Sequence, residues 1–204
     1  MLLIRKINNL LNGKKYYNYY YSQIIKKYKN IDSYTAVYNN VSQTNNIYES
    51  LTTINFSSDI EFGSNINKVK KSINSSYRFI KNPKSCDIIF YTTKVGYYKI
   101  IVELHFFRSK FVFFKYTFPS LKDKKKIEKL ILKKYFNKKT PIGDQLITDN
   151  NNNYIKIENE VTFSIYYFSK NYGFYSFLKE QQDNSKMKIL NKHYNSDSQL
   201  LEKI

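Results

Sequence analysis

The sequence predicts an α+β fold in which an antiparallel sheet packs against helices. Three observations predict it. β-Branched and aromatic runs occur at 88–95, 97–107 and 111–118, and similar runs occur within 145–169. Apolar residues with helical spacing lie before residue 88 and after residue 118. A 42% hydrophobic share with 21 Tyr and 15 Phe excludes a disordered chain, and 25% charged residues exclude a polytopic membrane protein. We therefore expect a soluble globular protein.

Residues 1–58 are predicted to form an N-terminal helical segment followed by a long connection. Within it, 16–30 has an apolar helical face made of Tyr17, Tyr20, Tyr21, Ile24, Ile25 and Tyr28. Residues 31–58 are rich in Ser, Thr and Asn without sustained periodicity, so they indicate a connection with one extended piece at Ile54–Phe56.

The α+β domain is predicted over 59–178. Gly63 offers a turn, Ser64 can cap a short helix over about 65–73 through its hydroxyl, and Ile66, Val69 and Ile73 mark the buried face of that helix. The three runs that follow, separated by Gly96 and by 108–110, predict a meander.

Alternation along the meander predicts which sheet face is buried. In the second run Tyr98, Ile100, Val102, Leu104 and Phe106 share one face, while Lys99, Glu103 and His105 fall on a face that we expect to be partly wet. In the third run the matching apolar face consists of Val112, Phe114, Tyr116 and Phe118.

A second helix and a second β region complete the domain. The Ser120-x-x-Asp123 start precedes a helix with a buried stripe of Ile127, Leu130, Ile131 and Tyr135. Strands are then predicted at 145–148, 154–158 and 161–169, with Val161, Phe163, Ile165 and Tyr167 on one face. The polar residues 179–204 predict a weakly ordered tail, either a frayed helix or disorder.

The net charge of +18 has two interpretations. One is a partner that carries negative charge, and the other is solubility combined with the Lys and Asn bias of an AT-rich genome. Basic residues interleaved with Tyr and Phe are typical of single-strand nucleic-acid binders, although only three Arg are present. The candidate contacts to an anion or partner are Lys14, Lys15, Lys26, Lys27, Lys122, Lys124, Lys125 and Lys126.

Motifs for catalysis are absent from the sequence. It has no Gly-rich phosphate loop, no G-x-S-x-G and no H-E-x-x-H, and one Cys with two His excludes a Cys/His-rich zinc site. Glu103 and His105 share a strand face, where a carboxylate could orient an imidazole for catalysis or metal binding, but the pattern favours a polar cross-strand pair, since no third ligand is evident. Cys86 is interpreted as a bystander without a disulfide partner in the chain, and no cofactor is expected.

One stretch resembles a known family. The order Phe62-Gly63-Ser64, then Val69-Lys70, a short helix and three strands between Ile88 and Phe118 is similar to the BamE-like (SmpA/OmlA) lipoprotein module, whose fold is shared with β-lactamase-inhibitor-like proteins. The resemblance covers about residues 59–118 and implies a non-catalytic scaffold that contacts proteins through its sheet or loops. The lipidation signal of that family is absent, and Ile73-Asn74-Ser75 lacks its Gly-x-Pro.

These observations together favour a non-enzymatic module that binds another protein, with an RNA- or DNA-associated protein using the Lys clusters as the alternative. No run approaches the roughly 18 apolar residues of a membrane span. A cytoplasmic location is expected. The alternative is an organelle presequence in 1–31, which carry seven basic and no acidic residues.

Overall fold

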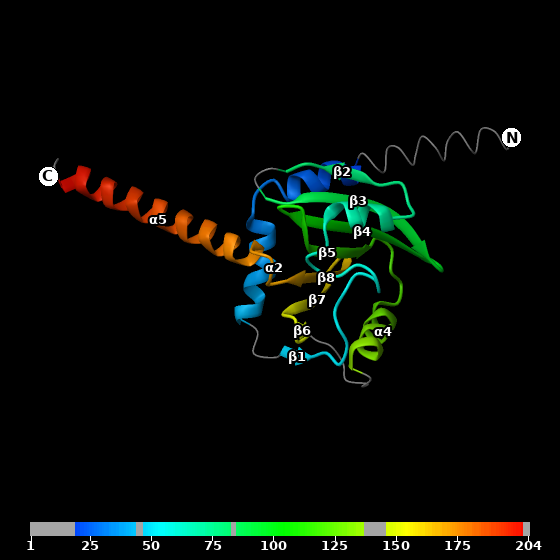
Figure 1. The fold of residues 1–204 in the computed structure, drawn as a ribbon. Coiled ribbons are helices and arrows are strands. Elements are labelled where there is room, and N and C mark those ends of the chain that lie inside the picture. Colours follow the sequence, from blue (N-terminus) through cyan, green and yellow to red (C-terminus); the bar gives the residue numbers. More distant parts are fainter. Residues whose placement is uncertain (1–18, 44–46, 83–84, 137–145, 202–204) are drawn as a thin grey trace.

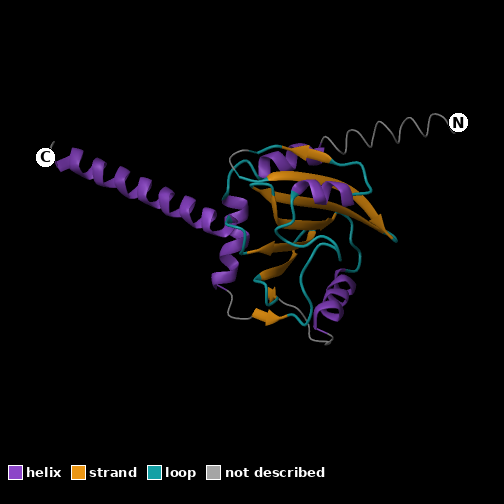
Figure 2. Ribbon diagram, in the orientation of Figure 1, coloured by secondary structure: helices purple, strands orange, loops and turns teal. Residues whose placement is uncertain are grey.

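The structure, a computed structural model, describes residues 19–43, 47–82, 85–136 and 146–201. It confirms the α+β fold, with one mixed sheet that packs against helices (Figures 1 and 2). After a helix over 19–27, the elements in chain order are α2 (Asp32–Gln43), β1 (Ile47–Glu49), α3 (Ile66–Ser72), β2 (Arg78–Ile80), β3 (Asp87–Val95), β4 (Tyr98–Phe107), β5 (Lys110–Phe118), α4 (Lys124–Phe136), β6 (Leu146–Thr148), β7 (Asn153–Asn159), β8 (Phe163–Ser169) and α5 (Phe174–Leu201).

The sheet has the strand order β1-β6-β7-β8-β5-β4-β3-β2. Only the β1–β6 pair is parallel, and the predicted meander corresponds to β3, β4 and β5. The β4–β5 turn is tighter than predicted, since Lys110 belongs to β5 and Arg108 and Ser109 alone make the turn, both with positive φ. That conformation matches the twist of the two strands, although Gly or Asn usually adopts it.

One face of the sheet packs against α3, α4 and the segment 54–62. Phe114 lies at its centre, with its ring stacked on that of Tyr167 at 4.2 Å and packed against the rings of Phe62 and Phe111. The prediction that Val112 faces this side is wrong. A β-bulge at His105/Phe106 turns Phe111 to this face instead and Val112 to the other.

The opposite face is covered by the helix over 19–27, by α2 and by the start of α5. The prediction of a connection from residue 31 is wrong here, because 32–43 form a helix whose buried residues are Tyr34, Val37, Tyr38 and Val41. Their spacing of three and four residues is the helical signature that the polar neighbours obscured. These rings pack on strand residues such as Phe113 and Phe168, so both faces of the sheet are buried.

Several smaller predictions are corrected. Asn65, rather than Ser64, caps α3 by accepting a hydrogen bond from the backbone N–H of Asn67. In α4, Leu132 is buried while Leu130 is exposed, and Val161 lies fully exposed in the β7–β8 turn. Of the helix predicted over 16–30, residues 16–18 lie outside the described part, 19–27 are helical and 28–30 form a turn.

Of the two forms predicted for the tail, a frayed helix or disorder, the described residues have the helix, α5. Phe174 and Leu178 in its first turns are buried against the body, beside α2. The rest of α5 runs away from the body, as Figure 1 shows, and its side chains are exposed from Asp183 to Asn191. The division of the chain at residues 58 and 178 stays a prediction, although α2 and α5 share one buried cluster with the strands.

Asp149 joins the segment 54–62 to the β6–β7 turn. Its buried carboxylate accepts hydrogen bonds from the backbone N–H of Ile54 at 2.7 Å, of Asn151 at 2.9 Å and of Asn153 at 3.0 Å. The side-chain amide of Asn153 donates a fourth at 3.0 Å. One carboxylate therefore fixes both a turn and a distant loop.

We expect Asp149→Ala to lower the free energy of unfolding by about 2–4 kcal/mol, because buried donors lose a charged acceptor. Urea denaturation at pH 7 measures this loss. The matched control is Asp123→Ala, which removes one exposed cap of α4, the hydrogen bond from the backbone N–H of Lys126, at a cost of about 1 kcal/mol. Equal losses in the two variants would contradict the role given to Asp149.

Candidate functional site

Glu103 and His105 lie on the β4 face that α2 covers. His105 is fully buried and Glu103 is 5% exposed, so the prediction of a partly wet face is wrong. The reason is that Tyr34 from α2 and Tyr28, just before it, pack their rings within 5.4 and 4.6 Å of the imidazole. The structure thus brings the two residues together in a dry environment, with 3.6 Å between His105 Nε2 and Glu103 Oε2.

The neighbours of His105 favour one tautomer. Burial lowers the pKa of His105, helped by the charges of Lys27 and Lys115 and opposed by Glu103, so the imidazole is neutral at pH 7. The Tyr34 hydroxyl, which burial keeps protonated by raising its pKa, lies 2.7 Å from His105 Nδ1. The carboxylate of Glu103 lies 3.6 Å from Nε2, which favours the tautomer with the ring proton on Nε2 and with Nδ1 as the acceptor from Tyr34.

Glu103 stays ionised in this environment. Burial alone would raise its pKa, but Lys115, His105 and Lys27 outweigh that effect and lower the pKa to about 2. Lys115 is the neighbour of Glu103 across β4 and β5, and Tyr166 is the neighbour of Lys115 across β5 and β8. The hydroxyl of Tyr166 in turn donates to Glu158. We call Glu103, His105, Lys115 and Tyr166 the polar row.

A cavity of about 450 Å³ opens at one end of the polar row, between the helix over 19–27 and the strands β4, β5 and β8. Glu103, Lys115 and Tyr166 line it, although each of them is buried, and His105 does not. The other lining residues are Tyr19, Tyr20, Gln23, Ile24, Lys27, Ile101, Thr117, Pro119, Glu158, Glu160, Val161, Thr162 and Ser164. The cavity therefore borders the charged end of the row, and the buried imidazole lies outside it.

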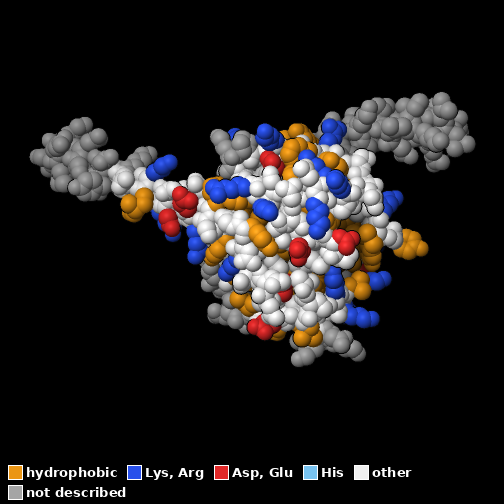
Figure 3. Space-filling view, viewed as in Figure 1, with side chains coloured by type: hydrophobic (Ala, Val, Ile, Leu, Met, Phe, Trp, Pro, Cys, Tyr) orange, Lys and Arg blue, Asp and Glu red, His pale blue; other side chains and the backbone are white. Residues whose placement is uncertain are grey.

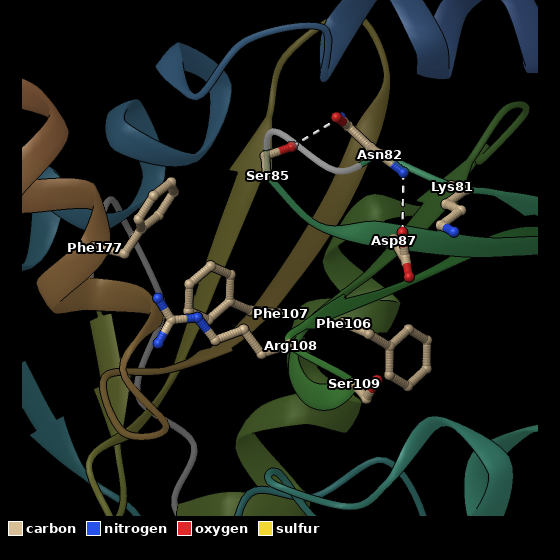
Figure 4. Close-up of a pocket in the computed structure, with 9 residues that line it drawn as sticks. All are labelled: Lys81, Asn82, Ser85, Asp87, Phe106, Phe107, Arg108, Ser109 and Phe177. Atoms are coloured by element: carbon tan, nitrogen blue, oxygen red, sulfur yellow. Dashed lines mark hydrogen bonds between the residues drawn. The ribbon is translucent and has the colours of Figure 1, made fainter.

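A second hollow, of about 330 Å³, lies beside the β4–β5 turn (Figure 4). There the Asn82 backbone N–H donates to Asp87 and its side-chain amide donates to Ser85, at 2.9 and 2.8 Å. The Arg108 guanidinium lies 5.0 Å from the centre of the Phe107 ring and points toward Phe177, as Figure 4 shows. These bonds join Asn82 to Ser85 and Asp87, so the polar groups of this hollow serve the fold first.

The predicted lysine contacts are spread over separate elements. Lys26 is exposed on the first helix, and Lys27 borders the cavity. Lys122, Lys125 and Lys126 are exposed at the start of α4, whereas Lys124 donates to the Glu160 carbonyl at 2.7 Å. Lys14 and Lys15, like most of the organelle signal considered in 1–31, lie outside the described residues.

Sequence reasoning missed Tyr34, Lys115 and Tyr166 as members of a site. The helical spacing of the apolar residues in α2 could have identified Tyr34. Lys115 could have been identified as a charged residue inside an apolar strand. Among the described residues, no group of three or more His, Cys, Asp or Glu could hold a metal ion. No helix in the described ranges combines the length and the apolarity that crossing a bilayer requires.

Comparisons of the chain with protein families, with curated proteins and with solved structures find no match. The site is therefore interpreted from its own geometry, and the BamE-like resemblance stays a prediction.

The neutral state of His105 predicts a pH dependence of stability. An unfolded chain takes up a proton on this histidine near pH 6.5, whereas the folded chain, with its lowered pKa, does so only at lower pH. Stability is therefore complete above pH 6.5 and falls as the pH decreases, by at most about 1.4 kcal/mol per pH unit for one proton. The lowered pKa of Glu103 adds its own loss only between about pH 4.5 and 2.

Urea denaturation at pH 7, 6 and 5 tests this dependence with His105→Gln. We expect the variant to be less stable at pH 7 but to lose less stability between pH 7 and 5 than the unmodified chain. His193→Gln, which replaces the other histidine, is the control and should keep the original slope. Parallel slopes for all three chains would show that His105 is not held neutral.

Proposed function

We propose that this chain is a non-catalytic module that binds another protein through the distal part of α5, which we define as residues 180–201. The observation that carries the proposal is apolar exposure on a helix that leaves the body: Met187, Ile189 and Leu190 are 56%, 58% and 60% exposed. Figure 3 shows this helix protruding with apolar side chains open to solvent. A lone helix gains little stability in water, so a partner that covers these side chains would stabilise it.

Other surfaces support a partner less well. Both faces of the sheet are covered by the chain's own helices, so the sheet contact that the BamE-like resemblance implies is not available in this arrangement. The edge strands β1 and β2 span three residues each, which offers little backbone for adding a strand. The distal part of α5 is the longest unpartnered element among the described residues.

The chemistry of the partner follows from charge and spacing. Met187 and Leu190 are three residues apart, so they lie on one face of the helix, while Ile189 lies on another. Lys186 and Lys188 flank this face, and the whole chain carries +18. We infer a partner that presents an amphipathic helix with an apolar stripe and acidic groups placed opposite Lys186 and Lys188.

A synthetic acidic amphipathic helical peptide, labelled for fluorescence anisotropy, tests this function on the full chain. We expect binding to weaken at least tenfold in Met187→Glu/Leu190→Glu, because the stripe carries the contact. The control Gln181→Glu/Ser185→Glu adds the same charge on the opposite side of the helix and should leave most of the affinity. A scrambled peptide should not bind.

Three results would overturn the proposal: equal weakening in both double variants, equal binding of the scrambled peptide, or no binding of the acidic peptide. Sedimentation of the free chain adds a further check. If α5 instead pairs with a second copy, the chain sediments as a dimer, and Met187→Glu/Leu190→Glu makes it a monomer.

A second candidate function, binding of RNA or DNA, is favoured by one observation. The first turn of α4 carries Lys124, Lys125 and Lys126 without an acidic residue, although the helix dipole disfavours cations there. Lys122, Lys125 and Lys126 are exposed and free to contact phosphates. In the space-filling view, however, Lys and Arg are spread among Asp and Glu over the visible face (Figure 3).

Binding of a single-stranded RNA oligonucleotide at different salt concentrations distinguishes this function. If it operates, affinity falls steeply between about 50 and 200 mM salt, and reversing the charges of Lys122, Lys125 and Lys126 to Glu flattens the slope. The control replaces three exposed lysines elsewhere, Lys71, Lys81 and Lys94, with Glu. Absence of binding at 50 mM salt, or equal effects of the two triple variants, would remove the candidate.

A further inference from the structure

The turn between β3 and β4 places apolar side chains in solvent. Gly96 and Tyr97 form this turn, in which Gly96 has a φ of 59°. The Tyr97 side chain is fully exposed and Val95 is 60% exposed, so neither side chain is part of a core. Two-residue turns favour small residues such as Asn and Gly, and a tyrosine gives no advantage there. The folding of the hairpin therefore does not explain the ring.

Two lysines lie directly behind this tip. Lys94 of β3 and Lys99 of β4 are neighbours across the two strands. Like charges in such a pair destabilise a hairpin, whereas anions that contact both ammonium groups would offset the repulsion. The hairpin thus combines an apolar tip with a positively charged pair.

A second apolar turn lies at the same end of the sheet. β4 begins and β5 ends at this end, and the pairing of Phe118 with Phe163 places the start of β8 there as well. The β7–β8 turn therefore lies at this end too, and its Val161 is fully exposed. Two separate turns present apolar side chains in one direction.

Basic residues surround these turns. The start of α4, which follows β5, adds the exposed Lys122, Lys125 and Lys126, against the acidic Asp123 and Glu160. Figure 1 shows the β3–β4 tip and the start of α4 on the same side of the molecule, and Figure 3 shows apolar side chains projecting there between Lys or Arg. This end of the molecule is therefore both apolar at its tips and positively charged around them.

We propose that this end of the molecule docks on the surface of a bilayer that contains anionic lipids. Tyr97, Val95 and Val161 enter the interface between headgroups and acyl chains, where an amphipathic tyrosine ring is favoured. The lysines contact the lipid phosphates. The two valines favour a bilayer over RNA, because a bilayer offers an aliphatic layer that RNA lacks. This docking is independent of the distal part of α5, so either proposal can fail alone.

A single tryptophan reports the insertion, since the chain itself has none. Tyr97→Trp is mixed with vesicles of phosphatidylcholine and phosphatidylserine whose acyl chains carry bromine, which quenches a tryptophan that enters the bilayer. We expect its emission to fall at least twofold relative to vesicles without bromine. The matched control is Tyr172→Trp, which is 45% exposed after the end of β8, at the opposite end of the sheet, and should not be quenched. Equal quenching of the two variants, or none in Tyr97→Trp, would overturn the proposal.

Sedimentation of the full chain with the same vesicles separates the apolar tips from the net charge of +18. We expect Tyr97→Asn/Val161→Asn, which places a turn-compatible residue at both tips, to bind at least tenfold more weakly. The control Leu51→Asn/Ile189→Asn removes exposed apolar side chains elsewhere and should bind as the unmodified chain does. Equal affinity of all three chains would mean adsorption by charge alone and would contradict the insertion.

Lys94→Gln tests the positively charged pair with two measurements. We expect weaker vesicle binding without a loss in the free energy of unfolding, because the substitution removes a repulsion. A less stable variant with unchanged vesicle binding would assign the pair to the fold and contradict its role in docking. Quenching of Tyr97→Trp by a single-stranded RNA oligonucleotide, with none by brominated vesicles, would overturn the bilayer in favour of RNA.

Discussion

The two-sided burial of the sheet is the constraint on which the rest of the structure depends. Strands with one wet face can place charges there freely, but here helices cover both faces, so the charged residues in the middle of β4 and β5 lie beside one another. Lys115 and His105 are neighbours of the Glu103 carboxylate, and Tyr34 shares a hydrogen bond with His105. The aromatic rings of Tyr28 and Phe113 pack on the imidazole, which lies outside the cavity at the end of the polar row.

Sequence patterns predicted the meander and the second β region because β-branched and aromatic runs bounded by turns are local signals. They failed where tertiary contacts decide the outcome. The helical face of α2 was hidden by Ser, Asn and Thr between its apolar residues, and missing α2 made the polar face of β4 seem wet. Phe111, and not Val112, lies on the sheet face of Phe114 because of a β-bulge, which has no signature in this sequence.

The candidate site, too, was predicted from the sequence only where the signal is local. Glu103 and His105 were paired from their spacing on one strand, and the structure confirms that they are neighbours. Lys27 was selected as one of several basic residues. What distinguishes it is that its ammonium group and that of Lys115, a residue about ninety positions away, both lie near the ring of Tyr166. Contacts of that kind depend on which helix packs on which strand, and composition alone cannot reveal them. For α5 the sequence left a frayed helix and disorder as alternatives, because its polar residues mark no buried face.

The most direct test of two-sided burial is the state of His105 in solution, measured from the nitrogen-15 chemical shifts of its imidazole between pH 5 and 8. The account predicts a neutral ring with the proton on Nε2 and an unprotonated Nδ1 throughout this range, because Tyr34 donates to Nδ1 and the helices exclude water. A ring that titrates near pH 6.5, or that carries its proton on Nδ1, would contradict it.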